Sequence, residues 1–271
     1  MRHQHPGSST KECPLADGRT LTYATAGDPE GAPVVVCHGT PGSRSFAAVC
    51  SDTAAVEGVH LVVPERPGYG TSTPPPRGWS WGDWRADLHQ LLDHEGIERT
   101  ALVGYSGGGP FALAAATDDR TTRIGLISSV IPPVENGFAT LSRAPLLLRF
   151  LSRLAVTLAG VRGPDAVVRQ FTDESVAGDV RRAVSEDFHE GFRQGARAFV
   201  RETRLLAEDP FDGPPSNVPV RAWHGTRDGN APIRPVRKFL RGTGGSVVTS
   251  ESDHLGTLLD HQRDVFAWTT G

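Results

Sequence analysis

Long hydrophobic runs, paired cysteines and a strong excess of charge are all missing from this sequence. None of its 271 residues belongs to an uninterrupted apolar segment approaching the roughly 18 residues that a membrane span requires. The first twelve residues, MRHQHPGSSTKE, lack the apolar core of a secretory signal. The three cysteines, Cys13, Cys37 and Cys50, are odd in number and show no CxxC spacing. This disfavours a disulfide framework and predicts a reducing, cytoplasmic location.

Charge and histidine usage argue against two further classes of protein. The formal net charge is -3, which gives no indication of a nucleic-acid-binding surface. The ten histidines are scattered and match no metal-ligand spacing. We therefore expect a protein that acts on a small molecule, without a metal, a nucleic acid or a membrane as its partner. Nothing in the sequence indicates an oligomeric state.

Short apolar runs bounded by glycine or proline predict strands, and these runs alternate with helical patterns. The expected strands are a hairpin at 13–27 and buried strands at 32–39, 59–70, 99–106, 123–130, 218–228 and 245–252. The expected helices lie at 80–97, directly after 106, at 233–240 and at 255–270. Buried strands alternating with helices form a mostly parallel sheet covered on both faces. The sequence thus predicts an α/β fold, a doubly wound sheet of about eight strands.

One long segment breaks this alternation. Between Pro132-Pro133 and Pro214-Pro215 the apolar residues recur at helical spacing, and no good strand pattern interrupts them. We interpret this segment as a helical cap over the sheet. The predicted divisions are a core at 12–131 and 217–271, a cap at 132–216 and a flexible N-terminus at 1–11.

The stretch GYSGG at 104–108 joins a predicted strand to a predicted helix. A sharp strand-to-helix turn brings two backbones close together, so only small residues fit beside the central serine. The turn also sets Ser106 at a helix N-terminus, where free N–H groups favour negative charge. A glycine-rich turn with a capping serine is the alternative. We interpret Ser106 as a nucleophile because suitable partners follow it in the expected order.

A serine nucleophile needs a base, and the base needs an acid that orients it. His254 lies just beyond the last predicted strand, and Asp228 ends the preceding one, so both are expected at the same sheet edge as Ser106. We predict that Ser106, His254 and Asp228 form a catalytic triad. A surface histidine and a turn aspartate are the alternatives. Glu135 is a second candidate acid, and Asp253 is expected to point away from His254.

Two backbone N–H groups are needed to stabilise the oxyanion of such a reaction. One is expected from Gly107, directly after the nucleophile. The other is expected from the loop HGTPG, which begins at His38. Because Pro41 has no N–H, Thr40 is the predicted donor and Gly39 is the alternative. We interpret His38 as a structural histidine that holds this loop, rather than as a second base.

Together these segments resemble the α/β-hydrolase fold family. The matching segments are HGTPG at 38–42, ERPGYG at 65–70, GYSGG at 104–108, HGTRD at 224–228 and DH at 253–254. The resemblance implies a cofactor-free hydrolase with a lid between the sixth and seventh strands. It also implies a structural role for the ERPGYG turn, which has Glu65 where the family usually has aspartate. Members that cleave carbon–halogen bonds or epoxides use an aspartate nucleophile, so Ser106 disfavours those activities.

The predicted activity is that of a serine esterase, which transfers the acyl group of a small carboxylic ester to water. A C–C bond hydrolase, a lactonase or a perhydrolase could use the same triad, and a hydrolase-like receptor is a further alternative. A prolyl-type aminopeptidase is disfavoured, since such members of the family often show HGGPG and GGSWG instead. Acidic cap residues could bind an amine but are more typical of a solvated helix surface; they include Glu186, Asp187 and Glu190.

Substrate contacts are expected from the cap and from the loops beside the triad. The candidates are Tyr105, Ser43, Trp81, Phe138, Leu141, Phe192 and Phe199. A further apolar stripe is interpreted as ordinary helix packing, with the wall of an acyl pocket as the alternative. It comprises Leu147, Phe150, Leu151, Leu154 and Leu158.

Overall fold

The computed structural model describes residues 8–208, 213–214 and 217–271. Its strands are β1 (Ser8–Pro14), β2 (Thr20–Gly27), β3 (Ala32–Cys37), β4 (Val59–Pro64), β5 (Thr100–Tyr105), β6 (Thr121–Ile127), β7 (Val220–Gly225) and β8 (Ser246–Ser250). They form one sheet in the order β1-β2-β4-β3-β5-β6-β7-β8. Strand β2 pairs antiparallel with β1 and β4, and the other neighbours are parallel. The predicted α/β fold is confirmed.

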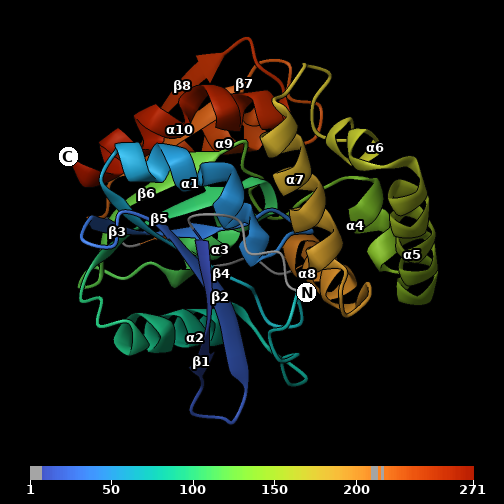
Figure 1. The fold of residues 1–271 in the computed structure, drawn as a ribbon, viewed down its shortest axis with the longest axis horizontal. Coiled ribbons are helices and arrows are strands. Elements are labelled where there is room, and N and C mark those ends of the chain that lie inside the picture. The colour runs from blue at the N-terminus through green and yellow to red at the C-terminus, as the bar shows by residue number, and fades with distance from the viewer. Residues whose placement is uncertain (1–7, 209–212, 215–216) are drawn as a thin grey trace.

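Helices cover both faces of this sheet (Figure 1). Outside the segment between β6 and β7 they are η1 (Arg44–Phe46), α1 (Ala47–Val56), α2 (Trp81–His94), η2 (Ser106–Gly108), α3 (Gly109–Ala115), α9 (Ile233–Thr243) and α10 (His254–Thr270). Residues of α2, α3 and α9 share one hydrophobic cluster with Leu102, while those of α1 and α10 share another with Val103. Because Leu102 and Val103 are adjacent on β5, they point to opposite faces of the sheet. Each face therefore has its own core.

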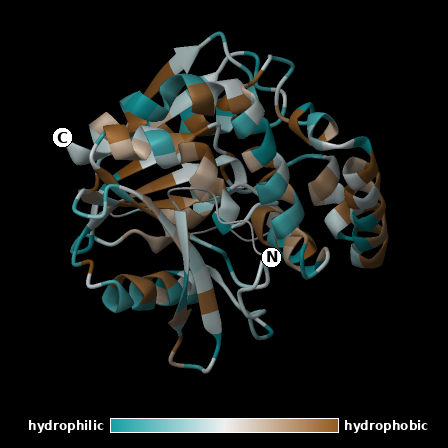
Figure 2. Cartoon of the chain, viewed as in Figure 1, coloured by the Kyte–Doolittle hydropathy of each residue, from teal (hydrophilic) through white to brown (hydrophobic). Residues whose placement is uncertain are grey.

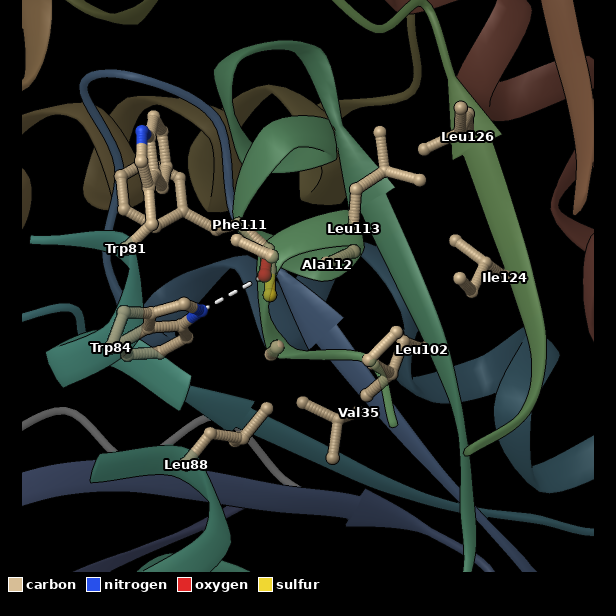
Figure 3. Packing of buried hydrophobic residues seen from close by; sticks show 14 of the residues in the cluster. Val35, Trp81, Trp84, Leu88, Leu102, Phe111, Ala112, Leu113, Ile124 and Leu126 are labelled. Atoms are coloured by element: carbon tan, nitrogen blue, oxygen red, sulfur yellow. Dashed lines mark hydrogen bonds between the residues drawn. The ribbon is translucent and has the colours of Figure 1, made fainter. Parts of the chain in front are cut away.

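The core under α2 fixes the helix that follows Ser106. Phe111 of α3 is fully buried, and its carbonyl oxygen accepts a hydrogen bond of 2.9 Å from Nε1 of Trp84 (Figure 3). The ring of Trp81 packs on the same phenylalanine, with 4.9 Å between the ring centroids. This packing holds α3 between α2 and the sheet.

The N-terminal hairpin differs from its prediction at one point. The turn at Asp17-Gly18 joins two antiparallel strands as expected, with Gly18 at φ +85°. However, residues 8–11, which we expected within a flexible N-terminus, form the first half of β1 and pair with β2. These polar residues suit an edge strand because their side chains are largely exposed while their backbone is hydrogen-bonded.

The segment between β6 and β7 forms helices and no strand within the residues described. These helices are α4 (Gly137–Ser142), α5 (Pro145–Arg162), α6 (Pro164–Val168), α7 (Gly178–Gly191) and α8 (Arg197–Glu208). They gather at one side of the sheet (Figure 1), and the name cap is used below for helices α4 to α8. Pro215 of the expected closing boundary lies outside the described residues. The leucine stripe of α5 is exposed, which corrects its interpretation as ordinary packing.

Candidate active site

Ser106 lies at a strained turn between β5 and α3. Its φ is +53°, in the left-handed region that residues with a side chain rarely adopt. The two backbones nearly touch there, since a Cβ at Gly104 would lie 2.4 Å from the Cα of Gly109. A Cβ at Gly108 would lie 2.1 Å from the carbonyl oxygen of Cys37. The predicted crowding around the serine is thus a feature of the structure.

The structure also brings His254 and Asp228 together. Asp228 follows β7, and His254 is the first residue of α10; Nδ1 of His254 lies 2.8 Å from Oδ2 of Asp228. Burial raises the pKa of the Asp228 carboxyl, but hydrogen bonds from His254 and from the backbone N–H groups of Ala231 and Asn230 outweigh it. The pKa of Asp228 is therefore lowered. An ionised Asp228 fixes the Nδ1–H tautomer of His254 and leaves Nε2 available as a base.

Aromatic rings place this histidine next to the serine turn. The ring centroid of His254 lies 5.1 Å from that of Tyr105, the residue that precedes Ser106. The histidine ring is also stacked on Phe171, at 6.3 Å between centroids. The hydroxyl of Ser128 donates a hydrogen bond of 3.0 Å to the carbonyl oxygen of His254. The imidazole is therefore held in one orientation by its neighbours.

The other candidate acids do not reach this histidine. Asp253 is the N-cap of α10: its Oδ1 accepts a bond of 2.9 Å from the N–H of Gly256. Its Oδ2 accepts a bond of 2.7 Å from the hydroxyl of Thr172. Glu135 is exposed in the segment after β6. The structure therefore pairs His254 with Asp228 and not with either alternative.

The two predicted oxyanion donors are neighbours. A Cβ at Gly107 would lie 3.2 Å from the backbone nitrogen of Thr40 and 2.4 Å from its Oγ1. Gly107 therefore packs directly on Thr40, and only glycine fits there. Gly39, the alternative donor, is also close: a Cβ on it would lie 3.6 Å from the Cβ of Ser106. The loop after β3 thus borders the serine turn.

His38 is completely buried at the base of this loop. Its Nδ1 lies 2.8 Å from the carbonyl oxygen of Gly39, and its Nε2 accepts a weak bond of 3.4 Å from the N–H of Arg66. Burial and the charge of Arg66 lower the pKa of His38 well below its usual value. A neutral, enclosed imidazole of this kind holds the loop, as we predicted from the sequence.

A buried ion pair ties the cap to the same loop. Arg66 and Glu202 are both fully buried, with Nε to Oε1 at 2.7 Å and Nη2 to Oε2 at 2.9 Å. Arg66 also donates to the carbonyl oxygens of His38 at 2.6 Å and Gly39 at 2.9 Å. Glu202, from α8 of the cap, accepts a further bond of 3.0 Å from the hydroxyl of Thr40. The cap and the loop therefore share one polar network.

A small cavity of about 30 Å³ lies beside Ser106. Such a space holds about two water molecules. Side chains from the cap and the core enclose it. The lining residues are Gly39, Thr40, Pro41, Phe46, Tyr105, Ser106, Phe171, Val184, Asp187, Phe188 and Leu255. No group of three or more His, Cys, Asp or Glu residues that could hold a metal occurs in the described part of the chain.

Of the seven side chains predicted to contact substrate, only Tyr105 is among the lining residues of this cavity. Ser43 is buried beneath the cap, and Trp81 belongs to the core under α2. The remaining four gather where α4, α5 and α8 pack together. They are Phe138, Leu141, Phe192 and Phe199. The helical spacing of these residues indicated an apolar side of a helix. It could not show whether that side packs against other cap helices or contacts the substrate.

Asp187 is the polar cap residue that the sequence interpretation misplaced. It lies on α7, is buried, and lines the cavity with Ser106. Its Oδ1 accepts bonds from the backbone N–H of Ser43 at 2.7 Å and from the Ser43 hydroxyl at 3.0 Å. Burial raises the pKa of Asp187 to about 7, and the two bonds from Ser43 only partly oppose this. The glutamates expected beside it differ: Glu186 is exposed, and Glu190 pairs with Arg44.

This pKa predicts a pH-dependent stability. An aspartate carboxyl loses its proton near pH 3.8 when unfolded, but Asp187 loses it near pH 7 when folded. The folded state therefore binds the extra proton between these values, and stability falls as pH rises, by about 1.4 kcal/mol per pH unit. We expect Asp187→Asn to remove this fall in the free energy of unfolding with rising pH.

Denaturant unfolding of the wild type and the variant from pH 4 to 8 measures the free energy of unfolding, with Asp52→Asn at an exposed site as control. Parallel pH profiles for wild type and Asp187→Asn would contradict the prediction.

Comparisons with known proteins agree with this architecture. The family model of the α/β hydrolase fold matches residues 32–193, which is more than half of the chain. The chain therefore belongs to the α/β-hydrolase fold family. It is similar to an esterase from Exiguobacterium antarcticum, with a TM-score of 0.74 and 18% identity over 94% of this chain and 96% of that one. At this identity the likeness shows the fold.

Relatives by sequence have different activities. Lipase 3 of Moraxella sp. (strain TA144) is 31% identical over 152 residues, which are 51% of this chain and 46% of the lipase. A probable proline iminopeptidase of Streptomyces coelicolor is 29% identical over 254 residues, or 78% of this chain and 74% of that protein. This chain thus spans about half the length of the lipase that it matches. The relatives support a hydrolase and leave its substrate open.

Proposed function

We propose that this hydrolase is a serine esterase that transfers the acyl group of a small carboxylic ester to water. The observation that carries the proposal is the pair of Asp228 and His254, at 2.8 Å, whose imidazole lies 5.1 Å from the ring of Tyr105, directly before a serine held at a positive φ. Ser128 also has a positive φ, of +44°, but of these two only Ser106 combines this strained backbone with a place on the wall of the cavity. Strain of this kind is typical of a nucleophile presented to its substrate.

The reaction follows from the roles of these groups. The hydroxyl of Ser106 attacks the ester carbonyl carbon while Nε2 of His254 accepts its proton. The N–H groups of Gly107 and Thr40 stabilise the resulting oxyanion. His254 then protonates the departing alkoxide, which leaves an acyl-enzyme. In the second half His254 removes a proton from water, and the resulting hydroxide attacks the acyl carbon. The bond to the oxygen of Ser106 then breaks, His254 returns its proton to that oxygen, and the carboxylic acid is released.

The lining of the cavity suits an acyl group. Its walls are mostly apolar, from residues such as Phe46, Val184 and Leu255. We also propose a cytoplasmic location, because all three cysteines are buried and unpaired.

Asp187 favours a second candidate, an aminopeptidase-like hydrolase whose substrate has an amino group close to the scissile carbonyl. A carboxylate on the cavity wall would bind such an ammonium group, and burial would strengthen the attraction. The two candidates differ in their substrates. Hydrolysis of p-nitrophenyl acetate favours the esterase, whereas hydrolysis of an unblocked amino-acid p-nitroanilide that is lost in Asp187→Asn favours the aminopeptidase.

Labelling with a fluorophosphonate tests the proposed nucleophile. We expect one covalent adduct on the peptide that contains Ser106, since an activated serine attacks the phosphorus and displaces fluoride. Mass spectrometry of the digested protein locates the adduct, and Ser106→Ala should remain unlabelled. Absence of any adduct would favour a hydrolase-like receptor. Esters, lactones and β-diketones assayed side by side then separate the esterase from a lactonase or a C–C bond hydrolase.

A further inference from the structure

Exposed hydrophobic side chains are concentrated in one part of the cap. Within the described residues, all exposed large hydrophobic side chains except Val56 and Val248 lie between residues 138 and 161. Val161 is 82% exposed and Leu146 is 76% exposed. The group comprises Phe138, Leu146, Leu147, Phe150, Leu151, Leu154, Leu158 and Val161. Contiguous apolar surface on a folded protein indicates an interaction site.

Most of these side chains form a continuous stripe along α5. Leu147, Leu151, Leu154, Leu158 and Val161 follow the spacing i, i+4, i+7, i+11, i+14, which places them on one side of the helix. A different set of residues on α5 already packs on the protein. This set is Leu148, Ser152 and Ala159, all buried. Helix α5 therefore has two apolar sides, of which the cap covers one.

The charged residues on α5 are all of one sign. By the helical period, Arg153 and Arg162 lie at the two edges of the exposed apolar side, whereas Arg149 lies on the side away from the leucine stripe. Arg143 lies just before the helix. No aspartate or glutamate occurs between residues 136 and 164, although the whole chain has a net charge of -3. None of the four arginines is joined by an ion pair to another described residue. Their charges are thus available to an anionic partner.

The stripe also lies where a partner can reach it. Helix α5 is at the outer edge of the cap, away from the sheet (Figure 1). Hydrophobic residues recur along its length there (Figure 2). An 18-residue helix is about 27 Å long. No described helix is long and apolar enough to cross a bilayer, so contact with lipid would have to be at the surface.

We propose that the exposed side of α5 docks on the surface of an anionic lipid bilayer. Leucine, valine and phenylalanine side chains would enter the boundary between headgroups and acyl chains, while Arg153 and Arg162, at the edges of this side, bind lipid phosphates. A second copy of the chain fits less well, because it offers no acidic residue between positions 136 and 164 to pair with these arginines. This proposal concerns where the protein acts, and it revises the expectation that no membrane takes part.

Vesicle sedimentation tests the proposal directly. We expect the full chain to bind vesicles of phosphatidylcholine mixed with phosphatidylglycerol at least about tenfold more tightly than vesicles of phosphatidylcholine alone, with the preference lost in high salt. The variant Leu147→Gln/Leu154→Gln/Leu158→Gln should bind the mixed vesicles at least about tenfold more weakly. Arg153→Gln/Arg162→Gln should lose the preference for the anionic lipid.

A matched control removes an equally exposed hydrophobic residue elsewhere. Val56→Gln on α1, where Val56 is 73% exposed, should bind the vesicles like the wild type. Circular dichroism and hydrolysis of a soluble ester check that the variants remain folded. Equal vesicle binding by the wild type and the triple variant, or no binding by either, would overturn the proposal. A dimer in lipid-free solution that the triple variant converts to a monomer would also overturn it, in favour of self-association.

Discussion

Ser106→Ala is expected to lower kcat for p-nitrophenyl acetate by at least about 10⁴-fold. The alanine lacks the hydroxyl that attacks the carbonyl, and His254 has no other nucleophile at this turn except water. Alanine and serine both have a Cβ, so the strain at φ +53° is the same in the two proteins. We therefore expect the denaturant midpoint to change little. Steady-state kinetics and denaturant unfolding measure the two quantities.

The double variant of Ser106 and His254 shows whether the two residues act in one catalytic step or contribute to activity independently. His254→Ala should cause a loss comparable to that of Ser106→Ala, and the double variant should lose no more than either alone, since each removes the same step. Ser51→Ala, at a partly exposed serine on α1, is the control and should keep full activity. Full activity in Ser106→Ala would show that another residue is the nucleophile.

The serine turn was predictable because part of its crowding is local. Gly104 packs against the backbone of Gly108 and Gly109, and this contact follows from a strand running directly into a helix. The crowding of Gly107 to Gly109 comes instead from the end of β3, from the loop after it and from Ser129, which are remote in sequence. The positions of Asp228 and His254 were predictable for a related reason. Parallel strands place their carboxyl ends at one edge, so residues just after β7 and β8 come near the end of β5.

The contacts of the cap side chains could not be predicted, because their partners are remote in sequence. A glutamate on a helix usually faces water, and nothing near Glu202 signals a partner as distant as Arg66. Asp187 was misplaced for the same reason. On α5 the helical period revealed an apolar side, but periodicity says nothing of what covers that side. The leucine stripe therefore looked like packing, although it is exposed.

Glu202→Ala is expected to destabilise the protein by about 3–5 kcal/mol. The change leaves the Arg66 guanidinium buried without its counter-ion, and both side chains are fully buried in the wild type. The hydroxyls of Tyr69, at 2.8 Å from Oε2, and of Thr40 also lose their acceptor. Denaturant unfolding measures the loss. The exposed pair of Arg181 with Asp165 is the control, since Asp165→Ala should cost less than about 1 kcal/mol.

A double variant distinguishes stability from loop positioning. Arg66→Met/Glu202→Leu removes both buried charges, so much of the stability lost in Glu202→Ala should return. The carbonyl oxygens of His38 and Gly39 still lack the donor that Arg66 provides. If the ion pair positions the Thr40 N–H for the oxyanion, kcat should stay about 10-fold or more below wild type while stability recovers. Recovery of both quantities together would mean that Arg66 and Glu202 only stabilise the fold. If kcat of the double variant stays low while its KM is unchanged, the cap residue Glu202 helps to stabilise the transition state through the loop that it holds.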